Sequence, residues 1–136
     1  MKHLLVFITL SLGTFDLYSQ AQQVTFDGPD GKEMTLRQYY VAFLMSGEIR
    51  SQNKEESEQI QSEHIAYLTK LWEDGIIILN GPFDEDTSLR GMSIYATDNA
   101  EQAKEFAEND PAVKSGRLKI EIHPWWSAPF MPEFTK

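Results

Sequence analysis

Residues 38–47, with the sequence QYYVAFLMSG, are predicted to form a strand that is apolar on both faces. Successive side chains of a strand point to opposite sides, so one face would carry Tyr40, Ala42 and Leu44, and the other Tyr39, Val41, Phe43 and Met45. A strand that is apolar on both sides has to be covered on both sides. The fold must therefore place one layer above this strand and another below it.

The other periodic segments follow this strand in the order of a known motif. A first helix is predicted to end near Asp74, with Gly75 as a left-handed cap, and a second helix to begin at Asp98, with Glu101 completing a capping box. Further strands are expected at residues 76–80, 92–97 and 117–123. The order β-α-β-β-α-β predicts an α+β, ferredoxin-like fold: a four-stranded antiparallel sheet with both helices on one face.

The second face of this sheet needs a cover that the two helices do not supply. We expect a second copy of the sheet to cover it in a two-fold homodimer, the arrangement of a dimeric α/β barrel, because large exposed apolar patches are rare on monomers. The alternative is that the aromatic C-terminal tail folds back across the sheet of its own chain.

Four segments divide the chain. Residues 1–21 join a charged start, a short apolar run and the ending YSQA, which is typical of a secretory signal peptide cleaved near Ala21. An uncleaved anchor or a buried N-terminal strand is the alternative. Residues 22–37 are predicted to be a polar arm with little structure, residues 38–126 the folded domain, and residues 127–136 a tail rich in proline and aromatic residues. Three prolines from Pro124 onward predict that no strand continues far into the tail. We therefore expect an exported protein, periplasmic or secreted.

The composition of the chain excludes several kinds of site and argues against two kinds of binding partner. The chain has no cysteine, which excludes disulfides, thiolate catalysis and a lipid-modified cysteine anchor. A formal net charge of −9, with lysines and arginines scattered along the sequence, argues against binding to nucleic acid or to an anionic membrane by the mature chain. The acidic run Asp84-Glu85-Asp86 lacks the longer ligand series of a calcium loop, so we interpret it as a solvated hairpin tip and expect no metal site.

One histidine lies in an apolar stripe of the first helix. His64 falls near the middle of the stripe formed at helical spacing by Ile60, Tyr67, Leu68, Leu71 and Trp72. It could be a neutral core residue with both nitrogens hydrogen-bonded, or a group that moves protons near neutral pH. Asp110, before Pro111, could likewise be a simple turn or capping residue, or a carboxylate that orients an imidazole.

The segments EHIAYLTKLWEDGIIILNGPF, GMSIYAT, EQAKEFAENDPAVKSG and IEIHPW, in this order and spacing, resemble the YCII-related family over residues 38–126. The resemblance implies a dimeric α/β-barrel fold, shared with muconolactone isomerase and cofactor-free monooxygenases. It also implies a His–Asp active site, which would fall on His64 and Asp110. One characterised activity in this family is the dehydrochlorination of a chlorinated hydroquinone. The chain departs from the family pattern at Ala112, where an aromatic residue is common, and in its apparent signal peptide.

Together these features predict a cofactor-free enzyme of the lyase or isomerase type. Ser62 lies on another part of the helix wheel than His64, and Ser46 and Ser93 are isolated, so no nucleophile accompanies the histidine. Proton transfer on a small cyclic or enolisable molecule therefore fits better than acyl transfer. Ligand contacts are expected from the backbone at Gly81 and Pro82 and from the rings of Tyr40 and Phe43. The alternative is a non-catalytic, extracytoplasmic module of the same fold that binds a small ligand or another protein.

Overall fold

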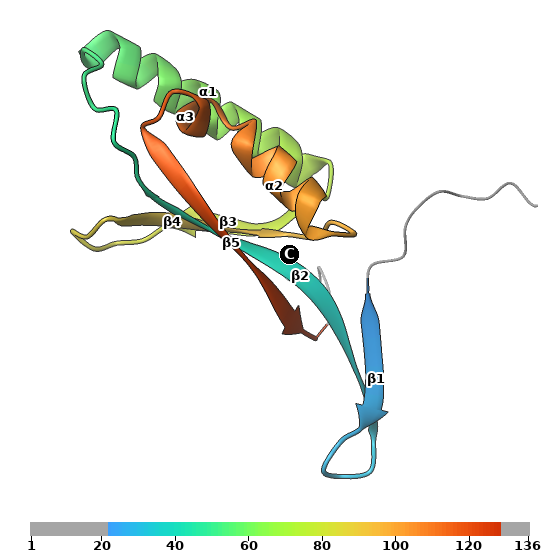
Figure 1. Cartoon of the computed structure of the whole chain (residues 1–136). Helices are drawn as coiled ribbons and strands as arrows, with labels where there is room; N and C mark the ends of the chain where they lie inside the picture. The colour runs from blue at the N-terminus through green and yellow to red at the C-terminus, as the bar shows by residue number, and fades with distance from the viewer. Residues whose placement is uncertain (1–21, 129–136) are drawn as a thin grey trace, which may run out of the picture.

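The computed structural model describes residues 22–128 (Figure 1). The predicted signal peptide and the end of the predicted tail lie outside these residues. The described part contains five strands and three helices: β1 (Gln23–Asp27), β2 (Glu33–Ser46), α1 (Lys54–Glu73), β3 (Ile77–Pro82), β4 (Leu89–Tyr95), α2 (Ala100–Glu108), α3 (Pro111–Lys114) and β5 (Leu118–Ser127). Within it, no helix is both long enough and apolar enough to cross a bilayer.

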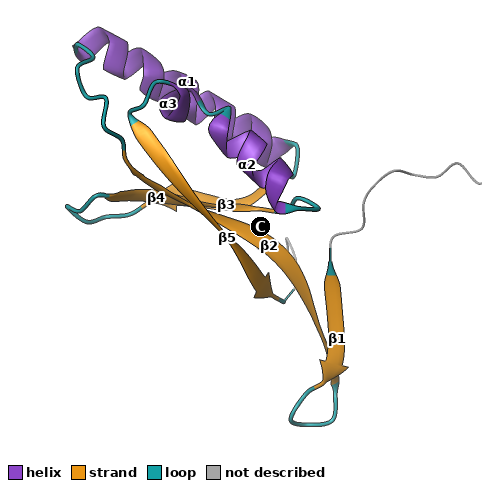
Figure 2. Cartoon of the chain, in the orientation of Figure 1, coloured by secondary structure: helices purple, strands orange, loops and turns teal. Residues whose placement is uncertain are grey.

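The ferredoxin-like fold is confirmed. The antiparallel pairs β3–β4, β4–β2 and β2–β5 give the strand order β3-β4-β2-β5, with β2 in the interior. All three helices lie against one face of this sheet (Figure 2). We call this the helix face and the opposite one the open face.

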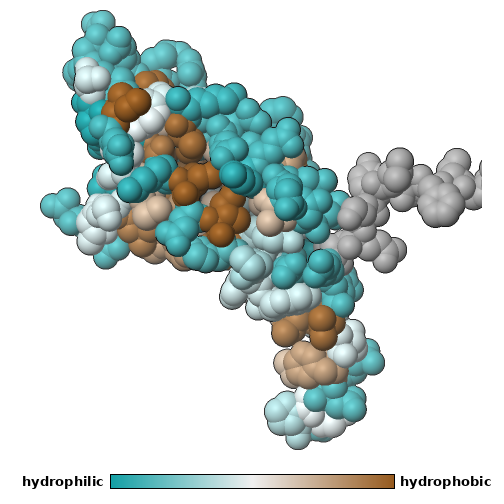
Figure 3. All heavy atoms as spheres, viewed as in Figure 1, coloured by the Kyte–Doolittle hydropathy of each residue, from teal (hydrophilic) through white to brown (hydrophobic). Residues whose placement is uncertain are grey.

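The predicted loose arm is instead a β-hairpin. Residues 23–27 pair with residues 33–37 in antiparallel register, around a turn in which Gly31 adopts a φ of 73°. Both segments alternate, and their apolar side chains meet in the pairs Val24–Leu36 and Phe26–Met34, an alternation that the polar composition of the arm obscured. The hairpin extends β2 beyond the helices and projects from the body of the protein, with apolar side chains on its surface (Figure 3).

Local signals set the helix ends. Gly75 follows α1 with a φ of 72°, as predicted. At the start of α1, Asn53 and Glu56 form a capping box that the sequence analysis did not assign. At α2 the prediction was one residue early. Asn99, not Asp98, is the N-cap, and its side chain accepts from the backbone N–H of Gln102 at 2.9 Å.

β5 is longer than predicted and continues through Pro124 to Ser127. In the described part of the chain β5 pairs only with β2, so it is an edge strand, and the missing N–H of proline is tolerated there.

β2 is buried on both faces, as its sequence predicts. Tyr40 and Ala42 pack under the helices with Leu71, while Tyr39 and Val41 are buried with Ile94 on the open face. β5 supplies part of the cover on the open face: the Trp125 ring lies 6.3 Å from that of Tyr39, and the His123 ring 5.9 Å from that of Phe43. These contacts lie between neighbouring strands of one sheet, so they do not test whether the tail folds back across it, and Trp125 stays 43% exposed and Leu79 51%.

Candidate functional site

A cavity of about 460 Å³ lies between α1 and the helix face of the sheet. Its α1 wall includes His64, Ile65 and Leu68, and Gly81 and Pro82 line it from β3. Such a volume is at the lower end of the range found for small-molecule sites.

His64 and Asp110 form a hydrogen-bonded pair beside this cavity. His64 Nδ1 lies 2.7 Å from Asp110 Oδ2 and 2.9 Å from Oδ1. A carboxylate accepts hydrogen bonds, so Nδ1 is the donor of this bond. In the neutral form of the ring, the lone pair is then on Nε2. Nε2 has no hydrogen-bond partner among residues 22–128, and His64 lines the cavity. Both interpretations of this histidine therefore describe part of it: one nitrogen is tied into the structure, and the other is free to meet a ligand.

Asp110 is held by its place at a helix start. It is the N-cap of α3, with Pro111 as the first helical residue, and its Oδ1 accepts from the backbone N–H of Ala112 at 2.8 Å. The residue is 1% exposed and does not line the cavity itself. The same buried carboxylate thus caps α3 and forms a hydrogen bond with the imidazole, and its role in orienting a catalytic ring stays a prediction.

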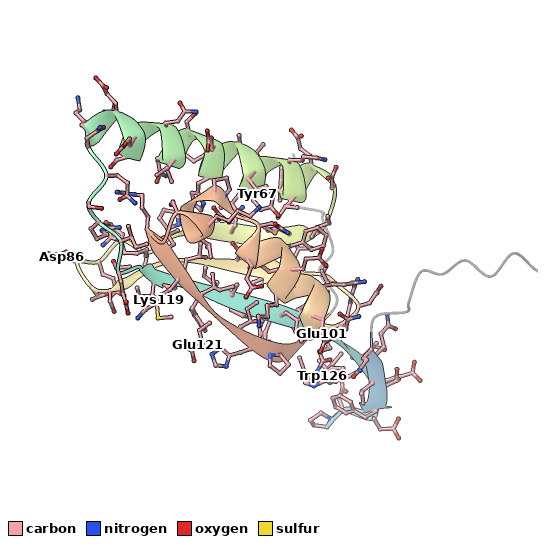
Figure 4. The ribbon with its side chains drawn as sticks, turned by 45° about the horizontal axis from the view of Figure 1, so that its top comes forward. Tyr67, Asp86, Glu101, Lys119, Glu121 and Trp126 are labelled. Atoms are coloured by element: carbon pink, nitrogen blue, oxygen red, sulfur yellow. The ribbon has the colours of Figure 1, made fainter. Side chains whose placement is uncertain are left out.

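Two phenols lie near this buried carboxylate. Burial raises the pKa of Tyr95, and the charges of Asp110 and Tyr67 raise it further. Burial likewise raises the pKa of Tyr67, with smaller contributions from the charges of Asp110 and Glu105. Tyr67 points from α1 toward the shorter helices (Figure 4), where its hydroxyl donates to the Phe106 carbonyl at 2.9 Å. Both phenols stay protonated at neutral pH and help to hold the helix layer around the pair.

The structure places only half of the predicted ligand-contact residues at the cavity. Gly81 and Pro82 line it, and their role as ligand contacts stays a prediction. Tyr40 and Phe43 are not among the residues that line the cavity: Tyr40 lies elsewhere on the helix face, and Phe43, three positions along the strand, points to the other face. Tyr40 is in the core of the helix face, where its hydroxyl donates to Gln38, and Phe43 lies on the open face against His123.

The acidic residues at the β3–β4 turn are exposed, and Asp86 lies at its tip (Figure 4). Across residues 22–128, no group of three or more His, Cys, Asp or Glu side chains is arranged to hold a metal ion.

Four polar residues that line the cavity were not assigned to the site from the sequence. Arg50, Arg90 and Arg117 line it, as does Ser93, whose Oγ is buried without a hydrogen-bond partner in the described part of the chain. The arginines are far apart in the sequence, so their scatter hid a cluster that forms only in the fold. No local signal marks Ser93, although its position on β4 opposite Ala42 assigns it to the helix face once the register is known.

Comparisons with known proteins identify the type of domain. The family model of the YCII-related domain matches residues 39–126, which is more than half of the chain. A search of curated proteins found no match. Among solved structures, the 5-chloro-2-hydroxyhydroquinone dehydrochlorinase from Burkholderia phenoliruptrix AC1100, in complex with 2,5-dihydroxybenzoquinone, is similar at 20% sequence identity and a TM-score of 0.49. That alignment covers 64% of the present chain and 92% of the dehydrochlorinase.

Proposed function

The chain belongs to the YCII-related domain family, and we propose that it is an enzyme of the lyase or isomerase type that moves a proton on a small enolisable or cyclic molecule. His64 is the general acid–base in this proposal, Asp110 is its positioning residue, and the step requires no cofactor.

One observation carries the proposal. His64 Nδ1 lies 2.7 Å from Asp110 Oδ2, while the same ring lines a cavity large enough for a small molecule. A histidine that served only the core would need partners for both nitrogens. Here the second nitrogen has none among the described residues and is left for a substrate.

The chemistry follows from this arrangement. Nε2 takes a proton from carbon or oxygen of the bound molecule, and the ring becomes an imidazolium that Asp110 stabilises through Nδ1–H. In an isomerisation, Nε2 returns the proton to another atom of the same molecule. In an elimination, the electron pair of the broken C–H bond forms a new double bond, and the leaving group departs with the electron pair of its own bond to carbon.

Solvent deuterium uptake tests the assignment without knowledge of the natural substrate. A panel of small cyclic ketones and keto acids with slow uncatalysed exchange is incubated with the protein in D₂O, and deuterium at carbon is measured by mass spectrometry. We expect accelerated uptake for a subset of the panel, reduced by about 10²–10⁴-fold in His64→Gln, the usual contribution of a general base.

His123→Gln is the matched control, because it removes a histidine from the open face, outside the cavity. It should exchange at the parental rate. If His64→Gln, correctly folded by circular dichroism, exchanges as fast as the parent, the acid–base assignment is wrong. Saturable binding to the parent without any uptake would favour the non-catalytic module instead.

We also propose that the protein is a homodimer formed through the open face. The support is the apolar surface that β5 leaves uncovered there: Leu79 and Trp125 are 51% and 43% exposed. Both belong to the face of the sheet that carries no helix, since Leu79 pairs with Ile94 and Trp125 with Tyr39. A second sheet packed on this face would remove them from water.

Export remains a proposal that rests on residues 1–21 alone. Expression of the full chain in a bacterial host, followed by N-terminal sequencing of the exported fraction, should give a mature protein that begins near Gln22. Retention of the intact N-terminus inside the cell would contradict it.

A further inference from the structure

Three of the four arginines in the chain line the cavity beside His64: Arg50, Arg90 and Arg117. They come from the loop before α1, from β4 and from the turn before β5. The protein carries a formal net charge of −9, yet no aspartate or glutamate is among the residues that line this cavity. Positive charge is thus concentrated at one site of an otherwise acidic protein.

None of these guanidinium groups is neutralised by the described part of the chain. No carboxylate of residues 22–128 lies within 4.0 Å of any of the three. Their hydrogen bonds go to neutral acceptors: Arg50 to the Arg117 carbonyl at 3.1 Å, Arg90 to the Thr87 carbonyl at 3.3 Å, and Arg117 to Gln52 and Ser57 at 3.0 Å each. A guanidinium has five N–H donors, so each keeps several for a ligand.

A separate observation also indicates a polar ligand. Ser93 is 1% exposed and lines the cavity, and its Oγ has no hydrogen-bond partner among the described residues. Leaving a buried hydroxyl unpaired costs free energy, which a ligand oxygen at this position would recover.

We propose that this cavity binds a small organic carboxylate. The planar fork of an arginine matches a carboxylate with two parallel hydrogen bonds, and the apolar wall formed by Leu44, Ile65, Leu68 and Leu118 suits a ring or short hydrocarbon body. The inference rests on the proposed function and deepens it by naming the substrate class of the same site. A guanidinium that does not hold the carboxylate can stabilise the enolate that forms when His64 removes a proton.

Matched pairs of ligands test this inference on the purified protein. The probes are benzoate against benzamide and cyclohexanecarboxylate against cyclohexanecarboxamide, which differ in charge but hardly in shape. Dissociation constants are measured by ligand-observed NMR or calorimetry. We expect each carboxylate to bind at least about tenfold more tightly than its amide, the effect of one charge-assisted hydrogen bond.

Arginine substitutions test whether these residues cause the preference for carboxylates over amides. Arg50→Gln, Arg90→Gln and Arg117→Gln should each weaken carboxylate binding by about tenfold and leave amide binding unchanged. Arg90→Gln is the most informative, because Arg90 is exposed and its one side-chain bond in the described part, at 3.3 Å, is weak, so the fold should survive its loss. Lys119→Gln removes an equal charge from an exposed residue outside the cavity and should leave the ratio unchanged.

The outcomes separate this inference from the proposed function. Equal binding of carboxylate and amide by the parent, or no binding of either carboxylate, overturns the inference, as does a preference that survives all three arginine substitutions. His64→Gln should keep the preference for carboxylates while losing deuterium uptake. If the preference holds but His64→Gln exchanges at the parental rate, the substrate class stands and the acid–base assignment fails.

Discussion

Asp110 Oδ1 accepts a hydrogen bond of 2.8 Å from the backbone N–H of Ala112, so the carboxylate that faces His64 is also the N-cap of α3. A short helix and a partly buried imidazole are held by the same side chain. Substitutions at this position can separate the two roles, because asparagine caps helices as well as aspartate does but carries no charge.

Stability should distinguish two replacements of Asp110. Asp110→Ala removes the cap and the partner of a partly buried histidine, and we expect the free energy of unfolding to fall by about 1–3 kcal/mol. Asp110→Asn keeps the cap and should cost about 1 kcal/mol or less. Urea unfolding followed by circular dichroism measures both. Asp98→Ala serves as control, because Asn99 caps α2 in its place, and equal losses for all three variants would contradict the capping role.

Substitution of Asp110 should affect catalysis differently from stability. Asp110→Asn no longer stabilises the imidazolium, so deuterium uptake should fall by about 10²–10⁴-fold even though the fold is kept. Because the two residues act as one unit, the His64→Gln, Asp110→Asn double variant should be little worse than His64→Gln alone. Strictly multiplicative losses in this cycle would show that the residues act independently.

Features that depend on local periodicity could be predicted from the sequence. The alternation in residues 38–47 placed Tyr40 and Val41 on opposite buried faces of β2, and the helical spacing of residues 60–72 placed His64 on the inner side of α1. The pairing of His64 with Asp110 came from the family resemblance, since residues 46 positions apart carry no mutual signal in one sequence.

Features that depend on tertiary structure could not be predicted in this way. Arg50, Arg90 and Arg117 line one cavity only because the fold brings three separate segments to it. The hairpin of β1 was missed for another reason. The two paired segments, residues 23–27 and 33–37, are short and polar on one side, so their composition resembled that of a loop, although Val24 and Phe26 already showed the alternation of a strand.

Gly47 should tolerate no side chain. A Cβ at this position would overlap the Gly116 carbonyl oxygen, and the Gly47 N–H donates to the Arg117 carbonyl at 2.8 Å. Gly47→Ala must therefore move the loop that carries Arg117, with a loss of stability of about 1–3 kcal/mol and a weaker preference for carboxylates. Thermal unfolding and the matched ligand pairs measure the two effects.

Gly81→Ala is the control for this variant, because nothing lies within 4 Å of a Cβ there. It should change the free energy of unfolding by no more than about 0.5 kcal/mol. If Gly47→Ala is as stable as Gly81→Ala, the backbone at Gly47 does not approach Gly116 and Arg117 as closely as in the structure.

The proposed homodimer should depend on the open face. Light scattering of the parent at micromolar concentration should give about twice the monomer mass, and Leu79→Lys should shift this value toward the monomer, because it places a charge in the apolar interface. Trp72→Ser, which removes a residue that is 54% exposed on the helix layer, should leave the mass unchanged. This interface would be ruled out if the parent had the mass of one monomer, or if Leu79→Lys had the same mass as the parent.

Stability should fall in strong alkali through the Tyr95 phenol. Burial, with a contribution from the charge of Asp110, raises the pKa of Tyr95 above its usual value of 10.0, so in this range the folded state holds a proton that the unfolded chain releases. The stabilisation is complete below pH 10 and is lost as pH rises toward the folded pKa, with a slope of up to about 1.4 kcal/mol per pH unit. Urea unfolding between pH 9 and 11 should show this decline in the parent and a shallower one in Tyr95→Phe.

Tyr67→Phe should also make the slope shallower, because burial raises the pKa of Tyr67 in the same direction. Parallel slopes for the parent and Tyr95→Phe would mean that water reaches this phenol, and the helix layer around His64 and Asp110 would then be more open than the structure shows.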